Sequence, residues 1–387
     1  MNIKELAHKY QQYTIDMRRE FHMHPELSMH EEKTAKRIME ELTKMGIPCV
    51  SIAGTGVLGT IKGKNPGKTI ALRADIDALE ITEKNEVPYK SQNEGVMHAC
   101  GHDSHAAMLL GAAKVLNDIK DELNGTVKLM FQPGEEVAQG AKAMVAGGAL
   151  DGVDEVFGMH VMGNFPTGKI AIGAGARMAS CDMFKITVKG KGGHGSMPHL
   201  GIDAVLAASA VVMNLQSIAS REVSPMDTVV VSVGKFISGT RFNIIADEAL
   251  LEGTTRCFSY EIRENLPKMI ERIAKATAES FRAEAELEYN FLTAPTINGE
   301  ESTERARKSI EKIMSKDAVV DMPKMAGSED FSEYLAKVPG TFALVGTANA
   351  EKDTCYSNHH AKFNIDEDML EHGVALHVQY AVDFLNE

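Results

Sequence analysis

The stretch Met97–Glu136 decides the expected fold, and it reads MHACGHDSHAAMLLGAAKVLNDIKDELNGTVKLMFQPGEE. It opens with a polar cluster of one thiol, three imidazoles and one carboxylate. Apolar residues at helical spacing then predict a helix over His105–Leu123, and the run Thr126–Phe131 predicts a buried strand. Paired carboxylates, Glu135 and Glu136, follow that strand closely. A helix that leads into a buried strand ending in polar residues indicates an α/β architecture.

The same alternation continues on both sides of this stretch. Further apolar runs predict the strands Gly56–Lys62, Thr69–Ala74, Glu155–His160 and Thr341–Gly346, and the helices Ser302–Ser315 and Asp366–Asn386. Such alternation predicts a layered α/β domain with a largely buried sheet. Asp75, Glu135 and His160 stand at the carboxyl ends of predicted strands, where the active groups of such sheets gather.

The N-terminal region is predicted to be helical. Residues Met1–Glu20 have an amphipathic helical pattern without the apolar core of a signal peptide. Ser28 and Glu31 form a capping-box pattern at the start of a second helix, which Gly46 ends.

The pattern changes near Cys181. Apolar and polar residues alternate from Phe184 to Lys189, which predicts a strand with one face in water. The elements predicted after it are the helix Asp203–Ser220, the strands Thr228–Ile237 and Asn243–Phe258, the helix Tyr260–Arg282 and the strand Ala285–Leu292. This β-α-β-β-α-β order predicts a small two-layer α+β domain of ferredoxin-like type. If His359 in the tail joins the site begun at Cys100, this domain, 183–292, is inserted into a catalytic domain formed by 1–182 and 293–387.

Composition and charge narrow the functional classes. The chain has 387 residues and a formal net charge of −13, and 44% of its residues are hydrophobic. These values fit a globular protein with room for two domains and disfavour nucleic-acid and anionic-membrane partners, which bind basic surfaces. No apolar run approaches the roughly 20 residues that span a bilayer. The five cysteines are odd in number and scattered, which predicts reduced thiols and a cytoplasmic protein.

The polar clusters contain the residue types of a metal site. Cys100 and His102 stand two apart and could point to the same side of an extended or irregular backbone. Glu135 and Glu136 could divide the work, one binding metal and the other moving protons. A Cys-x-His pair alone is weak evidence, because a half-buried cysteine beside structural histidines gives the same pattern.

Six motifs together carry a family resemblance. They are RADIDAL (73–79), ACGHDSH (99–105), QPGEE (132–136), GMH (158–160), HGSMPH (194–199) and HHAKFNIDE (359–367). Their order and spacing closely resemble metallopeptidase family 20, in the amidohydrolase branch of N-acyl-amino-acid deacylases, hippurate hydrolases and auxin-conjugate hydrolases. The resemblance covers essentially the whole chain. Arg73 stands where the wider family has a metal-binding histidine, and Cys100 stands where it has a bridging aspartate. This departure is typical of the amidohydrolase branch, in which His102 replaces the lost histidine ligand.

The resemblance implies a dinuclear metal centre. Its ligands would be Cys100, His102, Glu136, His160 and His359. Thiolate, imidazole and carboxylate groups bind zinc and its neighbours, so we expect two divalent ions drawn from zinc, manganese, cobalt and nickel. Asp75 would orient a ligand, although simple capping of the strand end explains it nearly as well. The histidines expected outside the ligand set, in structural or supporting roles, are His98, His105 and His360.

The resemblance also implies roles in catalysis and substrate binding. Glu135 would be the general base, and His194 would donate to the oxyanion, in relatives often across a dimer. Asn243 and Arg256 would bind the polar end of the substrate, the arginine gripping a free α-carboxylate. Ser328 would lie in a substrate-lining loop. Simpler interpretations are an exposed histidine for His194, a surface ion pair for Arg256 and a helix N-cap for Ser328.

The expected function is that of a cytosolic dinuclear-metal amidohydrolase. It would hydrolyse N-acyl-L-amino acids, with an acetyl, benzoyl or similar acyl group, to a carboxylate and the free amino acid. An N-acetyl-diaminopimelate deacetylase and a dipeptidase or carboxypeptidase remain as alternatives. A non-catalytic metal-binding scaffold is a further one, against which a base beside a full ligand set counts. We expect a homodimer or homotetramer formed through the inserted domain, which would act as a mobile lid.

Overall fold

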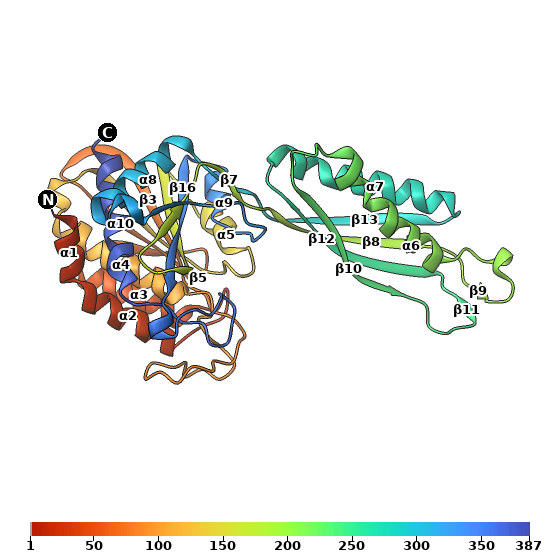
Figure 1. Cartoon of the computed structure of the whole chain (residues 1–387), viewed down its shortest axis with the longest axis horizontal. Coiled ribbons are helices and arrows are strands. Elements are labelled where there is room, and N and C mark those ends of the chain that lie inside the picture. The colour runs from red at the N-terminus through yellow and green to blue at the C-terminus, as the bar shows by residue number, and fades with distance from the viewer. Residues whose placement is uncertain (1) are drawn as a thin grey trace. The chain divides into compact units, whose positions relative to one another are not determined.

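The computed structural model describes residues 2–387, which divide into two compact units (Figure 1). Unit 1 consists of the chain up to Gly175, Ile297–Pro323 and Asp330–Glu387. Unit 2 consists of Ala176–Thr296 and Lys324–Glu329. The predicted insert, 183–292, lies within unit 2. Its roles as a lid and as a dimerisation domain stay predictions.

Unit 1 is built around an eight-stranded sheet. In spatial order its strands are β1 (Cys49–Ile52), β2 (Gly56–Lys62), β4 (Asn124–Gln132), β3 (Asn65–Asp75), β5 (Glu155–Pro166), β16 (Gly340–Ala348), β6 (Ile170–Ile172) and β15 (Val319–Asp321). The central strands β4, β3, β5 and β16 run parallel to one another. Most of the side chains along them are buried, as expected when helices cover a parallel sheet. The predicted α/β architecture is confirmed.

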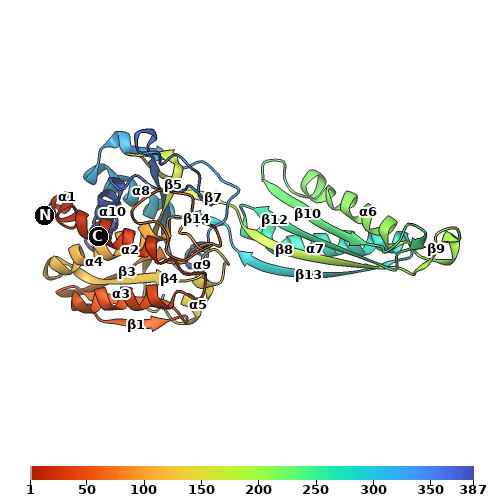
Figure 2. The ribbon, with the colours of Figure 1, turned by 90° about the horizontal axis from the view of Figure 1, so that it is seen from below.

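Helices pack against this sheet and against one another. They are α1 (Ile3–Lys9), α2 (Gln11–Met23), α3 (Glu32–Lys44), α4 (His102–Asp118), α5 (Gly140–Ala146), α8 (Glu300–Ile313), α9 (Ser332–Leu335) and α10 (Met369–Leu385). α4 and α10 pack on β3, and α3 packs on β1 and β2 (Figure 2). α4 is buried over most of its length, because α2 and α10 also pack against it. The polar residues at the start of α4 therefore lie in the interior of unit 1.

The capping box predicted at Ser28 and Glu31 is wrong. No side-chain hydrogen bond caps α3 from Glu31, its N-cap residue. The carboxylate of Glu26 accepts a hydrogen bond from the amide of Thr34, 2.9 Å away. Ser28 Oγ instead donates to Asp77 Oδ2, at 2.7 Å. A tertiary partner thus takes the hydroxyl that the local pattern assigned to the helix.

Unit 2 is a two-layer α+β structure. Its antiparallel sheet has the spatial order β10 (Val229–Ser238), β12 (Glu248–Cys257), β8 (Cys181–Lys189) and β13 (Glu284–Thr293). The helices α6 (Ala204–Leu215) and α7 (Tyr260–Ser280) pack side by side on one face of the sheet (Figure 1). Buried residues alternate with more exposed ones along β8, because the helices lie on one face. The order of elements along the chain is the predicted β-α-β-β-α-β.

The single strand predicted over Asn243–Phe258 is wrong, because it breaks into two elements. β11 (Ile244–Ile245) leaves the main sheet and pairs with β9 (Gly193–His194) at one end of unit 2 (Figure 1). The break falls at Ala246 and Asp247, whose carbonyls accept hydrogen bonds from amides outside the sheet. The strands β7 (Gly175–Met178) and β14 (Thr296–Asn298) form another two-stranded sheet.

One segment of unit 2 has the length and composition of a membrane-crossing helix. Residues 204–222, which take in α6 and the π-helix Ile218–Glu222, reach a mean hydropathy of 1.2. On those criteria alone, the expectation that no such segment exists is wrong. A single segment of this kind is weak evidence for a membrane span, because helices that pack on a protein core pass the same test. The buried side chains of α6 belong to the hydrophobic core of unit 2.

Candidate metal centre

Neighbouring strands of unit 1 bring polar residues to one level. β3 and β4 pair with Asp75 opposite Gln132, and β3 pairs with β5 with Arg73 opposite Gly158. Two residues further along both strands, Asp75 and His160 stand at the same level. Because parallel strands end at the same edge of a sheet, the segments that follow β3 and β4 meet beside His160.

Cys100 and His102 reach this edge through a glycine. Gly101 is the N-cap of α4 and has a φ of 90°, which is a left-handed conformation. A Cβ at this position would lie 2.3 Å from Cγ2 of Val161, so the site requires glycine on both counts. This turn, rather than extended backbone, lets two side chains that are two residues apart point to the same place.

The structure brings the five predicted metal ligands together. Cys100 Sγ lies 3.3 Å from His160 Nε2. Glu136 Oε1 lies 3.4 Å from His359 Nε2 and 3.9 Å from His102 Nε2. Ligand atoms of Cys100, His102 and His160 all lie within 4.8 Å of one another, as do those of Cys100, Glu136 and His359. These five residues, which we name the ligand cluster, come from widely separated segments, and their assignment as ligands stays a proposal.

The buried polar atoms of the cluster fit divalent ions. Within residues 2–387, His102 Nε2 and Glu136 Oε1 are buried without a hydrogen-bond partner. His102 Nδ1 lies 3.1 Å from Asp77 Oδ1, and His160 Nδ1 lies 2.7 Å from the carbonyl oxygen of Val161. Since both oxygens can only accept, each Nδ1 donates its proton, and the lone pair of each Nε2 is left for an ion. With the thiol and the carboxylate, these nitrogens form a donor set that suits zinc and similar ions.

The pKa shifts of Cys100 and His160 fit a metal site, whereas the raised pKa values of His102 and His359 favour their protonated forms. Burial raises the pKa of the Cys100 thiol to about 12, so the thiolate needs a cation beside it at neutral pH. Burial lowers the pKa of His160, which keeps its imidazole neutral, as a metal ligand must be. The carboxylate of Glu136, whose Oε1 lies 3.4 Å from Nε2 of His359, raises the pKa of His359. A bound cation would stabilise the thiolate of Cys100 and the nearby carboxylate of Glu136 at the same time.

A loop before α10 presents His359 in an unusual backbone conformation. The φ of His359 is 67°, and its amide donates to the carbonyl of Ala99, 2.7 Å away. The side-chain amide of Asn358 donates to the carbonyls of Cys100 and Val161, each at 3.1 Å. Asn358 therefore ties together the segments that carry Cys100, His160 and His359, a connection that the sequence did not indicate.

Glu135, the predicted general base, lies half-buried beside the ligand cluster. A carboxylate oxygen of Glu135 and ligand atoms of His102 and Glu136 lie within 4.8 Å of one another. This places a carboxylate within reach of a water molecule in the cluster, which is the first requirement for a base.

Sequence reasoning missed Asp77 and considered only Asp75. Asp75 pairs with Arg73 at 2.6 Å and with His105 Nδ1 at 2.5 Å, and it lies 3.7 Å from His102 Nε2. Asp77 forms the hydrogen bond with His102 Nδ1. Asp75 and Asp77 stand two residues apart in the RADIDAL motif, so the spacing alone does not show which of them contacts His102 Nδ1. The sequence feature that could have identified Asp77 is its position as a second acidic residue just beyond the end of the strand.

The three histidines expected outside the ligand set occupy different environments. His98 is fully buried, neither ring nitrogen has a hydrogen-bond partner in the described chain, and burial lowers its pKa to about 4. His105 Nε2 accepts a hydrogen bond from the amide of Val161, which follows His160. His360 is exposed and stacks on a tyrosine ring. Their supporting or structural roles stay predictions.

His194 is exposed in β9 of unit 2. Its Nδ1 accepts a hydrogen bond from the amide of Ser196 at 3.1 Å and lies 2.8 Å from the hydroxyl of the same residue. In the neutral ring the proton is therefore on Nε2. An Nε2–H group of this kind is the donor that an oxyanion requires.

The two residues predicted to bind the polar end of the substrate lie at opposite ends of unit 2. The carbonyl of Asn243 accepts a hydrogen bond from the amide of Gly195, next to His194. Arg256 lies near the far end of β12. From Glu248 to Arg256 this strand extends about 26 Å, at roughly 3.3 Å per residue. Within one chain, therefore, Asn243 lies beside His194 but far from Arg256.

The alternative that Ser328 caps a helix is wrong. α9 begins at Ser332, and its N-cap is Phe331. Ser328 is half-buried in the short segment Lys324–Glu329 of unit 2. Its contact with substrate stays a prediction.

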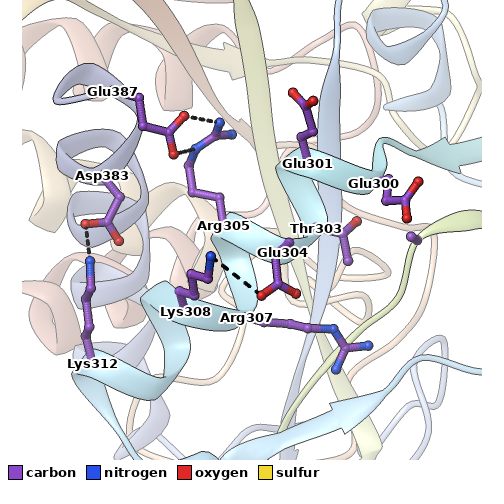
Figure 3. Close-up of a pocket in the computed structure, with 11 residues that line it drawn as sticks. Glu300, Glu301, Thr303, Glu304, Arg305, Arg307, Lys308, Lys312, Asp383 and Glu387 are labelled. Atoms are coloured by element: carbon purple, nitrogen blue, oxygen red, sulfur yellow. Dashed lines mark hydrogen bonds and ion pairs between the residues drawn. The ribbon is translucent and has the colours of Figure 1, made fainter.

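A separate hollow of about 880 Å³ lies on α8 and α10 of unit 1 (Figure 3). Six of the charged side chains that line it pair with one another: Arg305 with Glu387, Lys308 with Glu304 and Lys312 with Asp383. Because most of its charges are neutralised in pairs, the hollow is less suited to an ion than the ligand cluster is.

Known proteins resemble this chain over most of its length. Residues 71–383 match the family described as Peptidase family M20/M25/M40. The chain is 40% identical to thermostable carboxypeptidase 1 of Saccharolobus solfataricus, across 100% of this chain and 98% of that protein. It is 40% identical to the N-acetylcysteine deacetylase of Bacillus subtilis, across 92% of each. The crystal structure of the Bacillus subtilis YXEP protein, described as a dinuclear metal binding peptidase from the M20 family, matches at a TM-score of 0.87 with 36% identity, across 98% of this chain and 99% of that one.

Proposed function

The chain belongs to peptidase family M20/M25/M40, and we propose that it is a metal-dependent amidohydrolase that cleaves N-acyl-L-amino acids into a carboxylate and the free amino acid. The convergence of a thiol, three imidazoles and a carboxylate, with Glu135 beside them, carries this proposal. The relatives named as a carboxypeptidase and as an N-acetylcysteine deacetylase support cleavage of an amide bond next to an amino acid. The acyl group would be acetyl, benzoyl or similar.

The ligand cluster and Glu135 would perform the hydrolysis. Two divalent ions, when bound by the cluster, supply a water molecule of lowered pKa and polarise the acyl carbonyl. Glu135 accepts a proton as the water oxygen bonds to the acyl carbon. It returns that proton to the leaving nitrogen as the C–N bond breaks. The products are the carboxylate and the free amine.

Residues of unit 2 would hold the substrate. The Nε2–H of His194 donates to the oxyanion that forms on the acyl oxygen, and Asn243 lies beside His194. Arg256 binds the free α-carboxylate of the amino acid, where its planar guanidinium can form two parallel hydrogen bonds. Ser328 lines the substrate site.

A substrate panel tests this function. The protein is loaded in turn with Zn²⁺, Mn²⁺, Co²⁺ or Ni²⁺ and offered N-acetyl-methionine, N-acetylcysteine, hippurate and N-acetyl-diaminopimelate. We expect release of the free amino acid from at least one N-acyl amino acid, at a rate that depends on the metal. No hydrolysis with any metal, by a protein that binds metal, would favour the non-catalytic scaffold instead.

A carboxypeptidase or dipeptidase is the second candidate. The 40% identity to thermostable carboxypeptidase 1 over the whole chain favours it. Both kinds of substrate carry a free α-carboxylate on the leaving amino acid and differ on the acyl side. Comparing kcat/KM for hippurate and for the dipeptide Gly-Gly, which has a glycyl group in place of the benzoyl group, decides between the two candidates.

We further propose that the protein works as a homodimer or homotetramer assembled through unit 2. β10 is an edge strand of the sheet, and α6 exposes the apolar side chains of Leu206 (56%) and Met213 (71%). The length of about 26 Å along β12 also exceeds an N-acyl amino acid. One substrate could therefore meet Arg256 and the Asn243 end of unit 2 only if the two come from different chains.

Mixing two inactive variants tests this arrangement. In a mixed dimer of Glu135→Gln and His194→Ala chains, one site keeps its own Glu135 and receives His194 from the partner. Activity that returns on mixing supports the exchange of His194 between chains. If each chain uses its own His194, no site in the mixture is complete and activity does not return. Light scattering of the unmixed protein reports the oligomeric state.

The cysteines support a reducing compartment, which we propose is the cytoplasm. All five are free thiols: Cys49, Cys100, Cys181, Cys257 and Cys355. An oxidising environment would threaten a thiolate metal ligand such as Cys100.

A further inference from the structure

We infer that Glu31 is a positioning residue for Glu135, which it holds in place through the backbone amide of Gly134. The inference rests on the proposed function, because it takes Glu135 to be the general base. Glu31 stands 103 residues before Gly134 in the sequence, at the start of α3. It is not a metal ligand in this assignment and acts through the turn that carries Glu135.

The carboxylate of Glu31 is buried against the turn that follows β4. The residue is 0% exposed. Its Oε1 accepts hydrogen bonds from the amide of Gly134 at 2.9 Å and from the amide of Met29 at 2.8 Å. Its other oxygen, Oε2, accepts from the hydroxyl of Thr55, in the loop between β1 and β2. One buried side chain therefore joins three segments, and one of its contacts is the residue directly before Glu135.

The turn that carries Glu135 is closed by its own hydrogen bonds. The carbonyl of Gly134 accepts from the amides of Gln139 at 3.3 Å and Gly140 at 3.1 Å. The carbonyl of Glu135 accepts from the amide of Ala138 at 2.8 Å. Because these bonds fix the shape of the turn, the place of Glu135 beside the ligand cluster depends on how the turn is attached to the rest of unit 1.

Buried carboxylates hold the backbone on both sides of Glu135. The amide of Gly134 donates to Glu31, and the amide of Glu136 donates to Asp77 at 3.0 Å. Loss of the Glu31 contact should therefore move Glu135 while Glu136, a proposed metal ligand, keeps its own attachment. A general base has to lie within hydrogen-bond reach of the water that it deprotonates, and a misplacement of about 1 Å can cost about 10²-fold in rate.

Glutamine should be able to replace glutamate at position 31. The three donors to Glu31 are neutral groups, and burial raises the pKa of this carboxyl group, so its charge brings no advantage here. The amide oxygen of glutamine can accept from Gly134 and Met29, and its NH₂ group can donate to the hydroxyl of Thr55, which also accepts. Aspartate keeps the charge but is shorter by one methylene group. The length of the side chain, and not its charge, should therefore matter.

Steady-state kinetics of the metal-loaded variants test the inference, with the substrate of the panel above that the wild-type chain cleaves fastest. For Glu31→Ala we expect kcat to fall by about 10- to 100-fold, with KM and Zn²⁺ content near those of the wild-type chain. Glu31→Gln should keep most of the activity. Wild-type kcat in Glu31→Ala would overturn the inference. Equal losses in Glu31→Gln and Glu31→Ala would also overturn it, because they would assign the effect to the charge.

Thr55→Ala is the control for general damage. It removes the hydroxyl that donates to Glu31 and leaves both backbone contacts of Oε1 in place. Loss of a buried hydrogen bond should lower Tm, but kcat should stay near that of the wild-type chain. A purely structural role for Glu31 would give the same pattern in Glu31→Ala, with lower Tm and unchanged kcat.

A double-mutant cycle with Glu135→Gln shows whether Glu31 acts through Glu135. In the Glu135→Gln chain the placement of the base no longer matters, so adding Glu31→Ala should cause little further loss of kcat. In the wild-type background the same substitution should cause its full loss. Equal fractional losses in the two backgrounds would mean that Glu31 supports the site as a whole, which would overturn the inference.

The outcomes separate the inference from the function on which it rests. If Glu135→Gln is as active as the wild-type chain, the base assigned in the proposed function is wrong, and the inference falls with it. If Glu135→Gln is impaired and Glu31→Ala is not, only the inference is overturned. Should Glu31→Ala not fold, Glu31→Asp takes its place and should lose kcat while Glu31→Gln keeps it. Wild-type kcat in Glu31→Asp would then overturn the inference.

Discussion

The two units hold their proposed functional residues in opposite ways. In unit 1 the ligand cluster is largely buried apart from His359, whose side chain is 55% exposed, and hydrogen bonds fix the rings of His102 and His160. In unit 2 His194 and Asn243 are exposed, and Arg256 lies at the other end of the unit. A buried, hydrogen-bonded cluster has its geometry before substrate arrives, whereas exposed residues gain theirs on contact with substrate or another chain. We therefore expect the fold of unit 1 to prepare catalysis and the proposed assembly to complete recognition.

Metal removal should have the largest effect and should be confined to unit 1. After chelation we expect no measurable hydrolysis, because the proposed activation of water and carbonyl both need the ions. Circular dichroism should still show the helices and sheets, because none of the proposed metal ligands belongs to the hydrophobic cores of the two units. Added Zn²⁺ or Mn²⁺ should restore activity. Full activity in a chain shown by elemental analysis to be free of metal would contradict the assignment of the cluster.

Glu135→Gln should have the next largest effect. The substitution keeps the shape of the side chain but removes its basicity, so kcat should fall by about 10²- to 10⁴-fold. Zn²⁺ content and Tm should stay near those of the wild-type chain, because Glu135 lies outside the ligand set. A variant with near wild-type turnover would remove Glu135 from the mechanism.

Arg256→Ala should have a smaller effect, seen mainly in KM. Losing a charged hydrogen-bond pair with the α-carboxylate should raise KM by about 10- to 100-fold. A matched pair of substrates, hippurate and its methyl ester, separates recognition from general damage. The ester lacks the carboxylate, so the variant should lose little on it. Equal losses on acid and ester would show that Arg256 does not bind the carboxylate.

Acid stability offers the smallest contrast between the units. Burial opposes the ionisation of Glu41 in unit 1, but hydrogen bonds from Lys44 and two other neighbours outweigh it and lower its pKa to about 2. The stability that this carboxylate contributes is present above its unfolded pKa of 4.5 and is lost as the pH falls toward 2. Glu41→Gln should therefore cost about 1 kcal/mol at pH 7 and little near pH 2.

Glu286→Gln in unit 2 is the matched control for that measurement. Glu286 pairs with Lys189 at 2.6 Å, but its side chain is 63% exposed, so the pair should contribute little. Thermal melts followed by circular dichroism at pH 7 and pH 3 compare the two variants. Equal pH dependence in both would mean that the hydrogen bonds of Glu41 do not lower its pKa in the folded chain.

The sequence predicts most of the architecture because the strands and helices have strong local patterns. The strand Gly56–Lys62 is confirmed at both ends, since turn residues precede it and its apolar face is unambiguous. The strand Asn243–Phe258 is predicted wrongly, because the apolar residues on both sides of Ala246 and Asp247 resemble one continuous run, although alanine and aspartate are poor strand formers. The carbonyls of these two residues accept hydrogen bonds from amides far along the chain, and such contacts cannot be read from the local sequence.

A residue of the proposed site can be predicted where its type alone indicates its chemistry. It cannot be predicted where its role depends on a contact with a distant segment of the chain. Cys100 and Glu136 have side chains of metal-ligand type next to apolar segments, and that can be recognised in a sequence. Asp77 and Asn358 act through contacts with segments far along the chain. Ser28 illustrates the limit, because a local motif assigned its hydroxyl to a helix while the fold gives it to Asp77.

Gly101 has a consequence for how far this chain can vary. Gly95 has a similar left-handed conformation, with a φ of 79°, but a Cβ there would meet nothing within 4 Å. Asparagine or aspartate, which tolerate that conformation, should be accepted at position 95. At position 101 the Cβ itself would collide with Val161, so a library of all twenty residues selected for activity should return glycine alone. Two glycines with nearly the same backbone angle would thus have very different mutational tolerance, set by the neighbour and not by the turn.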